Sequence, residues 1–139
     1  MKIGPDTWFF FKLRDREVNA VNLLEKIISG EITAIVSVIT ITELYGKMFQ
    51  LGEPESAEHF KAICLIIPTI IITDIDIEIA EKAGRYRHGL GIPTVDSIIL
   101  ATSVLKGCEC IISQDKHFLK AKEQSIIEVK KPEDLVFHR

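Results

Sequence analysis

The sequence predicts an α/β fold, a three-layer α/β/α sandwich built on a central, mostly parallel sheet. Short β-branched apolar runs alternate with amphipathic stretches of helical length, which is the pattern of a parallel sheet flanked by helices. Glycines and prolines separate these segments. With 139 residues, 47% of them apolar, the chain has the size and composition of one globular domain, which we expect to span residues 1–139.

The first half of the chain carries two predicted strands and three predicted helices. In order, they are a short strand that starts at residues 1–3 and ends near Asp6, a helix at 18–28, a strand at 34–38, a helix from 40 to 52 and a helix from 54 to 65. The first helix has apolar residues at helical spacing and ends at Gly30. Thr40 and Glu43 have the spacing of a capping box at a helix start. Gly4 and Pro5 are expected to interrupt the first strand.

The second half alternates strands and helices in the same way. We predict a buried strand at 70–73, a helix from 77 to 89, a helix from 94 to 106, a strand at 109–113, a short helix at 115–121 and a last strand at 126–129 before a polar tail. Asp74 or Asp76 is expected to cap the first of these helices. The inner side of that helix is predicted from its spacing as Ile77, Ala80, Ala83 and Gly84.

Composition argues against several classes of protein. A net charge of −3 disfavours a large cationic surface for nucleic acid, although it leaves room for a local basic rim. The longest apolar run, residues 63–72, contains Pro68 and is far shorter than the roughly 20 residues of a membrane helix. The apolar block at 8–11 precedes its basic residues, unlike a signal peptide. Three cysteines, without a second pair of metal ligands, indicate reduced thiols, so we expect a cytoplasmic protein.

Four carboxylates, far apart in the sequence, each fall where a strand or loop passes into a helix. They are Asp6, Glu43, Asp96 and Asp115. In a parallel sheet all such junctions lie along one edge, where open α/β folds bind ligands. We therefore expect the four acids to share one crevice.

Each acid taken singly also has a structural explanation. Glu43 could complete the capping box, Asp96 could complement a helix dipole, and Asp115 could be an N-cap. Their conjunction is harder to explain in this way, because acids on one edge repel each other unless a cation neutralises them or their pKa values rise. Oxygen ligands alone select a hard ion such as Mg²⁺ or Mn²⁺. Such ions activate water for phosphodiester hydrolysis, which is the chemistry we predict.

With these residues in place, the chain resembles PIN-domain ribonucleases, and among them the toxins of VapBC toxin–antitoxin pairs. The resemblance runs from Asp6 to Phe118. It is carried by four motifs, in order Asp6-Thr7, Thr40-Ile41-Thr42-Glu43-Leu44, Pro93-Thr94-Val95-Asp96-Ser97 with the apolar residues that follow, and Ile111-Ile112-Ser113-Gln114-Asp115-Lys116-His117-Phe118.

The resemblance implies a PIN-like fold with a metal site at Asp6, Glu43, Asp96 and Asp115, supported by the Ser113 hydroxyl. It also implies metal-dependent cleavage of single-stranded or loop RNA, an antitoxin partner and a homodimer. Two features depart from the family. Gly4-Pro5 precedes the first acid where an apolar strand is usual, and Trp8 stands where many members have asparagine.

Several other residues have competing interpretations. Five cations could bind RNA phosphates, although charged residues on helix surfaces are usually only solvated: Lys47, Arg85, Arg87, His88 and Lys116. His117 is more typical of a surface residue than of a ligand. The aromatic run at 8–11 could stack on bases or contact a partner helix, and it could equally pack in the core or in a dimer interface.

Three alternatives to a toxin nuclease remain open from the sequence. The chain could be an inactive PIN scaffold that binds RNA or protein. It could be a housekeeping RNA-processing nuclease. It could also be a phosphatase that uses Asp74 and Asp76, although these acids equally suit a helix cap.

Overall fold

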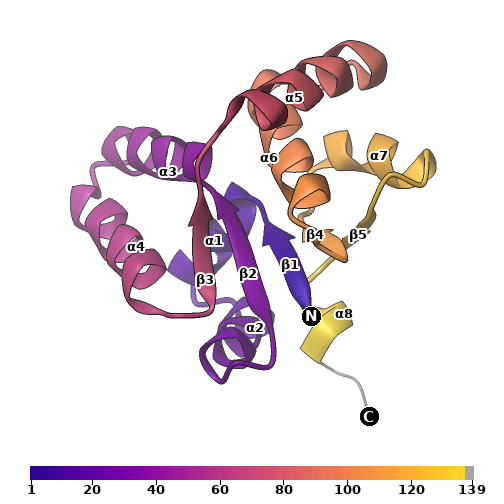
Figure 1. Cartoon of the computed structure of the whole chain (residues 1–139). Coiled ribbons are helices and arrows are strands. Elements are labelled where there is room, and N and C mark those ends of the chain that lie inside the picture. The colour runs from indigo at the N-terminus through magenta and orange to yellow at the C-terminus, as the bar shows by residue number, and fades with distance from the viewer. Residues whose placement is uncertain (137–139) are drawn as a thin grey trace.

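The computed structural model describes residues 1–136, in which five strands form one sheet with helices packed around it (Figure 1). The strands are β1 (Lys2–Pro5), β2 (Thr33–Ser37), β3 (Ile70–Thr73), β4 (Cys110–Ile112) and β5 (Glu128–Lys130). Their spatial order is β3-β2-β1-β4-β5, and every neighbouring pair is parallel. The predicted fold class is therefore confirmed.

The helices follow the predicted pattern with two additions. They are α1 (Thr7–Arg14), α2 (Val18–Ile28), α3 (Val38–Gln50), α4 (Pro54–Ile66), α5 (Ile77–Leu90), α6 (Thr94–Leu105), the 3-10 helix η1 (Lys116–Phe118), α7 (Leu119–Glu123) and α8 (Glu133–Val136). The sequence analysis did not delineate α1, and α8 lies in the predicted polar tail. Within residues 1–136, every helix is too short or too polar to cross a membrane.

Successive side chains of β4 point to opposite faces of the sheet and pack into two different core clusters. Cys110 and Ile112 pack into the larger cluster, which α1 to α4 and α8 complete. Ile111, between them, packs into the second cluster with residues of α6, α7 and β5. This is the expected behaviour of a strand that is buried on both faces. Helix α5 packs against α6 through a third small cluster and extends away from the sheet (Figure 1).

The strand order creates a topological switch point between β1 and β4. From β1 the chain passes to β2 and β3 on one side, and later crosses to β4 and β5 on the other. At such a point the connections leave the carboxyl ends of the two strands in opposite directions, which opens a crevice between them. Asp6 directly follows β1, and Ser113 directly follows β4.

Pro5 lies within β1 and does not interrupt it, contrary to the prediction. It is in register with Ile112 of β4, whereas the pairing of β1 with β2 ends at Ile3. The amide of Asp6 donates to the Ile112 carbonyl at 3.1 Å. Because successive amides of a strand point to opposite sides, the N–H that Pro5 lacks would face β2 beyond the end of their pairing. A proline is tolerated there in a central strand.

Gly4 is also part of β1, and its lack of a side chain has a packing reason. A Cβ at this position would lie 2.1 Å from Ser103 Oγ of α6. Helix α6 therefore approaches the strand so closely that only glycine fits. The Gly4-Pro5 pair leaves the strand intact and brings α6, which carries Asp96, against the sheet.

The predicted capping box at Thr40 and Glu43 is wrong. Helix α3 begins earlier, with Ser37 as its N-cap, whose Oγ accepts from the Ile39 amide at 3.3 Å. Thr40 is fully buried inside the first turns of the helix. Because the chain turns directly from β2 into α3, the last residue of the strand supplies the cap and Glu43 is free for another contact.

The predicted burial of β3 is wrong, and of the four residues predicted for the inner side of α5 only Ala83 is buried. Strand β3 is an edge strand, and Ile71 is 47% exposed. On α5 the buried residues are Ile79, Ala83 and Leu90, whereas Ile77 is 89% exposed. The helix packs on α6 rather than on the sheet, so the direction of α6 decides which face of α5 is covered.

Asp76 is the N-cap of α5, which was one of the two predicted choices. Its side chain accepts a hydrogen bond from the Ile79 amide at 2.8 Å.

The three cysteines are free thiols, as the sequence indicated. Burial raises the pKa of Cys64 and of Cys108 to about 11, and that of Cys110 to about 12. Their thiolates are therefore scarce at neutral pH, and the cysteines act as small apolar core residues.

Candidate active site

The register of β1 and β4 places Asp6 beside Ser113. Pro5 and Ile112 are paired across the two strands, so the residues that follow them leave the sheet side by side. Ser113 Oγ donates a hydrogen bond to Asp6 Oδ2, and it also accepts from the Asp115 amide at 2.8 Å. A single hydroxyl thus fixes one predicted site acid and the backbone of another.

Glu43 reaches the same place from α3. The Thr7 hydroxyl, in the first turn of α1, donates to Glu43 Oε1. Thr7 is itself buried, so it holds the glutamate in position next to the end of β1. This contact replaces the Thr40 amide that the capping-box interpretation had assigned to Glu43.

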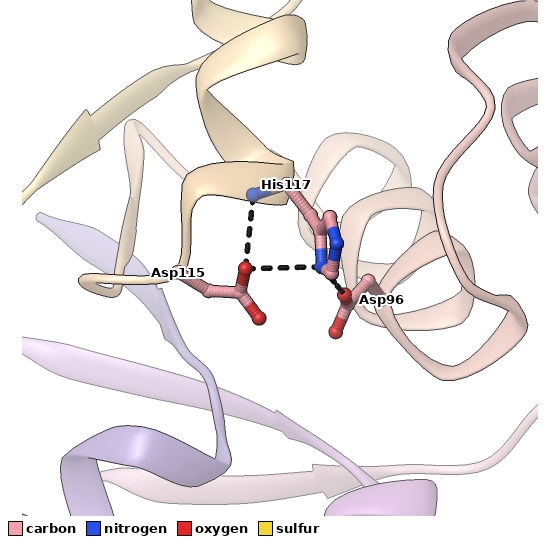
Figure 2. Close-up of side chains that lie close together, drawn as sticks. All are labelled: Asp96, Asp115 and His117. Atoms are coloured by element: carbon pink, nitrogen blue, oxygen red, sulfur yellow. Dashed lines mark hydrogen bonds and ion pairs between the residues drawn. The ribbon is translucent and has the colours of Figure 1, made fainter.

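Asp96 and Asp115 approach each other across His117 (Figure 2). Asp96 comes from the first turn of α6, and Asp115 is the N-cap of η1, where its Oδ1 accepts from the His117 amide at 2.9 Å. His117 Nδ1 lies 2.9 Å from Asp96 Oδ2 and 3.0 Å from Asp115 Oδ1. One imidazole nitrogen therefore contacts both carboxylates.

A cleft of about 610 Å³ contains all four predicted acids. Its lining residues come from the ends of β1 and β4 and from α1, α3 and α6: Asp6, Thr7, Trp8, Phe11, Glu43, Lys47, Asp96, Ile99, Gln114 and Asp115. The expectation that the four acids converge at one sheet edge agrees with this geometry.

Two acids of the cleft, Asp6 and Asp96, have raised pKa values. Burial raises the pKa of Asp6 to about 7, and repulsion from Asp115 and Asp96 adds to the effect, while the Ser113 hydrogen bond opposes it. Burial also raises the pKa of Asp96, with repulsion from Asp115 in the same direction. Without a cation, therefore, Asp6 resists full ionisation near neutral pH.

The donor set fits a divalent cation. Asp6 is 5% exposed, and its Oδ1 atom is buried without a hydrogen-bond partner among residues 1–136. A buried carboxylate oxygen with no partner is costly unless something else satisfies it. Asp96, Asp115 and His117 each offer a ligand atom within 4.8 Å of the others. Carboxylate oxygens in an open cleft are suited to Mg²⁺ or Mn²⁺.

The predicted phosphate-binding cations do not form one rim. Lys47 lines the acidic cleft. Lys116, in η1, is exposed next to Asp115. Arg85 and Arg87 lie on α5, where Arg85 pairs with Glu81 at 3.8 Å and Arg87 Nε donates to Thr94 Oγ1 at 2.8 Å. Neither arginine lines the cleft, because α5 packs outside α6.

The aromatic run divides between core and cleft. Phe9 and Phe10 are 1% exposed in the larger core cluster, and Phe10 packs edge-on against Phe60. Trp8 and Phe11 are half-buried and line the acidic cleft. Helical spacing explains this division, since two adjacent residues of a helix face the core while their neighbours turn outward.

His117 and Thr7 are the contacts that sequence reasoning missed. The sequence favoured a surface position for His117, whereas its side chain is 36% exposed and its Nδ1 lies between two acids. One signal was present: a residue two positions after an N-cap aspartate lies on the same side of a tight first turn. The pairing of Thr7 with Glu43 depends on how α1 crosses α3, for which the sequence carries no local signal.

Comparison with known proteins identifies the fold. The model of the PIN-domain family matches residues 4–124. The VapBC2 structure from Rickettsia felis, bound to a DNA fragment from its promoter, is similar with 17% identity and a TM-score of 0.74, covering 94% of this chain and 98% of that one. A toxin–antitoxin complex from Klebsiella pneumoniae is similar with 23% identity and a TM-score of 0.68, covering 94% and 97%.

A DNA-bound VapBC from Salmonella typhimurium gives the same result, with 18% identity and a TM-score of 0.69 over 95% of this chain and 98% of that one. Among curated protein sequences, none matches this chain. At these identities the structural likeness concerns the fold. The family model, in contrast, spans most of the sequence and the whole acidic cleft. The chain therefore belongs to the PIN-domain family.

Proposed function

We propose that this protein is a cytoplasmic, Mg²⁺- or Mn²⁺-dependent endoribonuclease that acts as the toxin of a toxin–antitoxin pair. The observation that carries the proposal is the convergence of Asp6, Glu43, Asp96 and Asp115 in one cleft, together with the buried, unpartnered Asp6 Oδ1. Membership of the PIN-domain family supports the same chemistry. Solved toxin–antitoxin complexes with this fold support the toxin role.

The four acids are the groups that would hold the cation. When bound, such an ion activates water and neutralises charge on a phosphodiester. Ser113 keeps Asp6 Oδ2 occupied, while Oδ1 is buried without a hydrogen-bond partner among the described residues. Thr7 does the same for one oxygen of Glu43. These hydrogen bonds fix the acids before substrate arrives, which lowers the cost of organising the site during reaction.

The remaining walls of the cleft suit an RNA strand. Lys47 places a positive charge beside the acids, where it can attract a phosphate. Trp8, Phe11 and Ile99 offer apolar surface on the same cleft. Unpaired bases stack on aromatic side chains, and such contacts are available in single-stranded RNA but not inside a duplex. This combination favours single-stranded or loop substrates.

Cleavage of a labelled RNA pool with Mn²⁺ tests the proposal. We expect the native protein to cleave, and Asp96→Asn to lose about a thousandfold or more of this activity, because catalysis by positioned charge is lost with the group that positions it. EDTA should abolish cleavage by the native protein. A matched control is Asp76→Asn, which makes the same change at the N-cap of α5, outside the lining of the cleft, and should leave cleavage within about twofold.

Retention of full activity by Asp96→Asn would overturn the assignment of this acid. Binding of RNA without cleavage in Mn²⁺ would instead support the inactive binding module. Two observations count against the phosphatase alternative: Asp76 caps α5, and neither Asp74 nor Asp76 lines the cleft.

The antitoxin part of the proposal needs its own test. We expect a small protein encoded beside this chain to co-purify with it and to suppress RNA cleavage when both are present. If the adjacent product neither binds nor inhibits while the chain cleaves RNA, a housekeeping RNA-processing nuclease becomes the better description.

A further inference from the structure

We propose that His117 supplies a nitrogen ligand to the cation of this site, which then prefers Mn²⁺ and similar transition-metal ions over Mg²⁺. The inference rests on the proposed function, because it concerns the same cleft. It goes beyond the four-acid site, which would offer oxygen ligands alone.

The separations of the three ligand atoms carry the proposal. His117 Nδ1 lies 2.9 Å from Asp96 Oδ2 and 3.0 Å from Asp115 Oδ1. Ligand atoms at adjacent corners of an octahedron are about 3 Å apart when each metal–ligand bond is about 2.1 Å. The imidazole nitrogen is thus already spaced from each acid as a neighbouring ligand of one ion would be, and all three ligand atoms lie within 4.8 Å of one another (Figure 2).

The backbone fixes the imidazole in this position. His117 is the second residue of η1, and its amide donates to Asp115 Oδ1 at 2.9 Å. Phe118, the next residue, is fully buried in the core cluster beneath the helix. Asp115 is held in turn, because its amide donates to Ser113 Oγ. Groups that orient a ligand in this way commonly support metal affinity.

A second observation, independent of the histidine, points to a ligand in the same cleft. Asp6 is buried and its Oδ1 has no partner among the described residues, although it lines the cleft that Asp96 and Asp115 also line. The alternative role for His117 is that of a permanent N–H donor shared by the two carboxylates. In that role Nδ1 would carry a proton and could not bind the ion. Experiment can separate this role from that of a metal ligand.

A nitrogen ligand changes which ions the site selects. Mg²⁺ prefers oxygen ligands and retains water, whereas transition-metal ions accept imidazole readily. The mixed set of carboxylates and one imidazole therefore favours Mn²⁺ over Mg²⁺. Selection of the ion would depend on His117, and binding of any ion would depend on the acids.

Pulsed electron paramagnetic resonance of bound Mn²⁺ tests the proposal directly. We expect the native protein at pH 8 to show electron spin echo modulation from a directly bound nitrogen. Labelling only the histidines with ¹⁵N should shift the modulation frequencies without changing the protein. His117→Gln should remove the signal, and His59→Gln, on the exposed face of α4, should keep it.

Affinity measurements by calorimetry give the second readout. We expect His117→Gln to weaken Mn²⁺ binding about 10- to 100-fold and to change Mg²⁺ binding less than about threefold. Binding of Mn²⁺ without nitrogen modulation in the native protein would overturn this inference and leave the proposed function standing. Absence of Mn²⁺ binding in the native protein would overturn both.

Discussion

Asp6 is the residue in which the conflict between folding and function is most direct. It is buried at the end of β1, its Oδ2 is bound by Ser113, and its Oδ1 has no partner among the described residues. Burial raises the pKa of Asp6 to about 7. In the absence of metal, its ionised form therefore lowers the stability of the fold, as expected where a site is organised for a ligand that is not yet bound.

Asp6→Asn is expected to stabilise the metal-free protein at high pH. The ordinary pKa of this carboxyl is 3.8, and burial raises its pKa to about 7 in the folded protein, so folding takes up a proton between these values and stability falls as pH rises through this window. The amide cannot ionise. We expect it to raise the free energy of unfolding by about 2–4 kcal/mol at pH 8.

Urea denaturation in EDTA at pH 8 and at pH 4 measures this difference. The difference in free energy of unfolding between native and Asp6→Asn protein should nearly vanish at pH 4. At that pH most of the native folded protein has Asp6 protonated and so carries no buried charge. Equal stabilities at pH 8 would contradict the assignment of a costly buried carboxylate.

Trp8 is the only tryptophan of the chain, and it lines the acidic cleft. If RNA bases stack there, an unstructured oligonucleotide should quench its fluorescence when bound to Asp96→Asn in EDTA, which prevents cleavage. Trp8→Ala should weaken binding in fluorescence anisotropy about 5- to 150-fold, since stacking contributes about 1–3 kcal/mol per base. Phe9→Leu, a change in the core, is the control that should leave affinity unchanged. Binding without any change in Trp8 emission would exclude contact with the base.

At the scale of elements, the approach of α6 to β1 governs the site. Helix α6 carries Asp96 and packs so closely that Ser103 fills the space above Gly4. Helix α3 carries Glu43, and α1 holds it through Thr7. Two of the four acids are therefore positioned by helices packed on the sheet, and Asp6 and Asp115 follow β1 and β4 as N-caps, as a preorganised site requires.

Gly4→Ala should lower the free energy of unfolding by about 1–3 kcal/mol, because overpacking forces strand and helix apart. Its Cβ would lie 2.1 Å from Ser103 Oγ and 3.0 Å from Ser103 Cβ. Combining it with Ser103→Ala should recover part of the loss. Gly46→Ala in α3 is the matched control, since a Cβ there meets nothing within 4 Å and alanine favours the helix. Urea denaturation distinguishes these outcomes, and equal loss in both glycine variants would contradict the packing argument.

At the scale of the whole molecule, exposed apolar side chains lie on several elements, including Val18 and Ile28 on α2. Those on α3, α4, β3 and α5 include Phe49, Leu65, Ile66, Ile71 and Ile77. Leu65 and Ile66 are 68% and 75% exposed. A homodimer could cover such residues.

Light scattering at micromolar concentration tests this expectation. We predict a species of twice the chain mass, and we predict that the pair of changes Leu65→Glu and Ile66→Glu shifts it to the monomer while the fold remains intact, because both side chains are exposed. The matched control is Val18→Glu, which alters an exposed residue of α2. A native protein that stays monomeric would contradict the expected homodimer. The chemistry of the cleft does not depend on dimerisation.

The sequence by itself determined the α/β class, most of the strands and helices, and the convergence of four acids at one sheet edge. These features follow from local signals, because apolar periodicity, glycine and proline stops and the position of an acid after a strand are all readable within a few residues. The strand at 70–73 and the helix at 18–28 agree in their bounds with β3 and α2. That residues 1–139 form one domain stays a prediction.

Only the tertiary structure decided which neighbours each residue meets. The N-cap at Ser37, the outward position of Ile77, the place of Arg85 and Arg87 outside the cleft and the contact of His117 with Asp96 all depend on how helices cross one another. Such contacts join residues distant in sequence, and their geometry is set by side-chain packing and strand register rather than by local propensity. Local sequence thus places the four acids at the starts of helices, whereas the residues that contact each acid are decided by the tertiary fold.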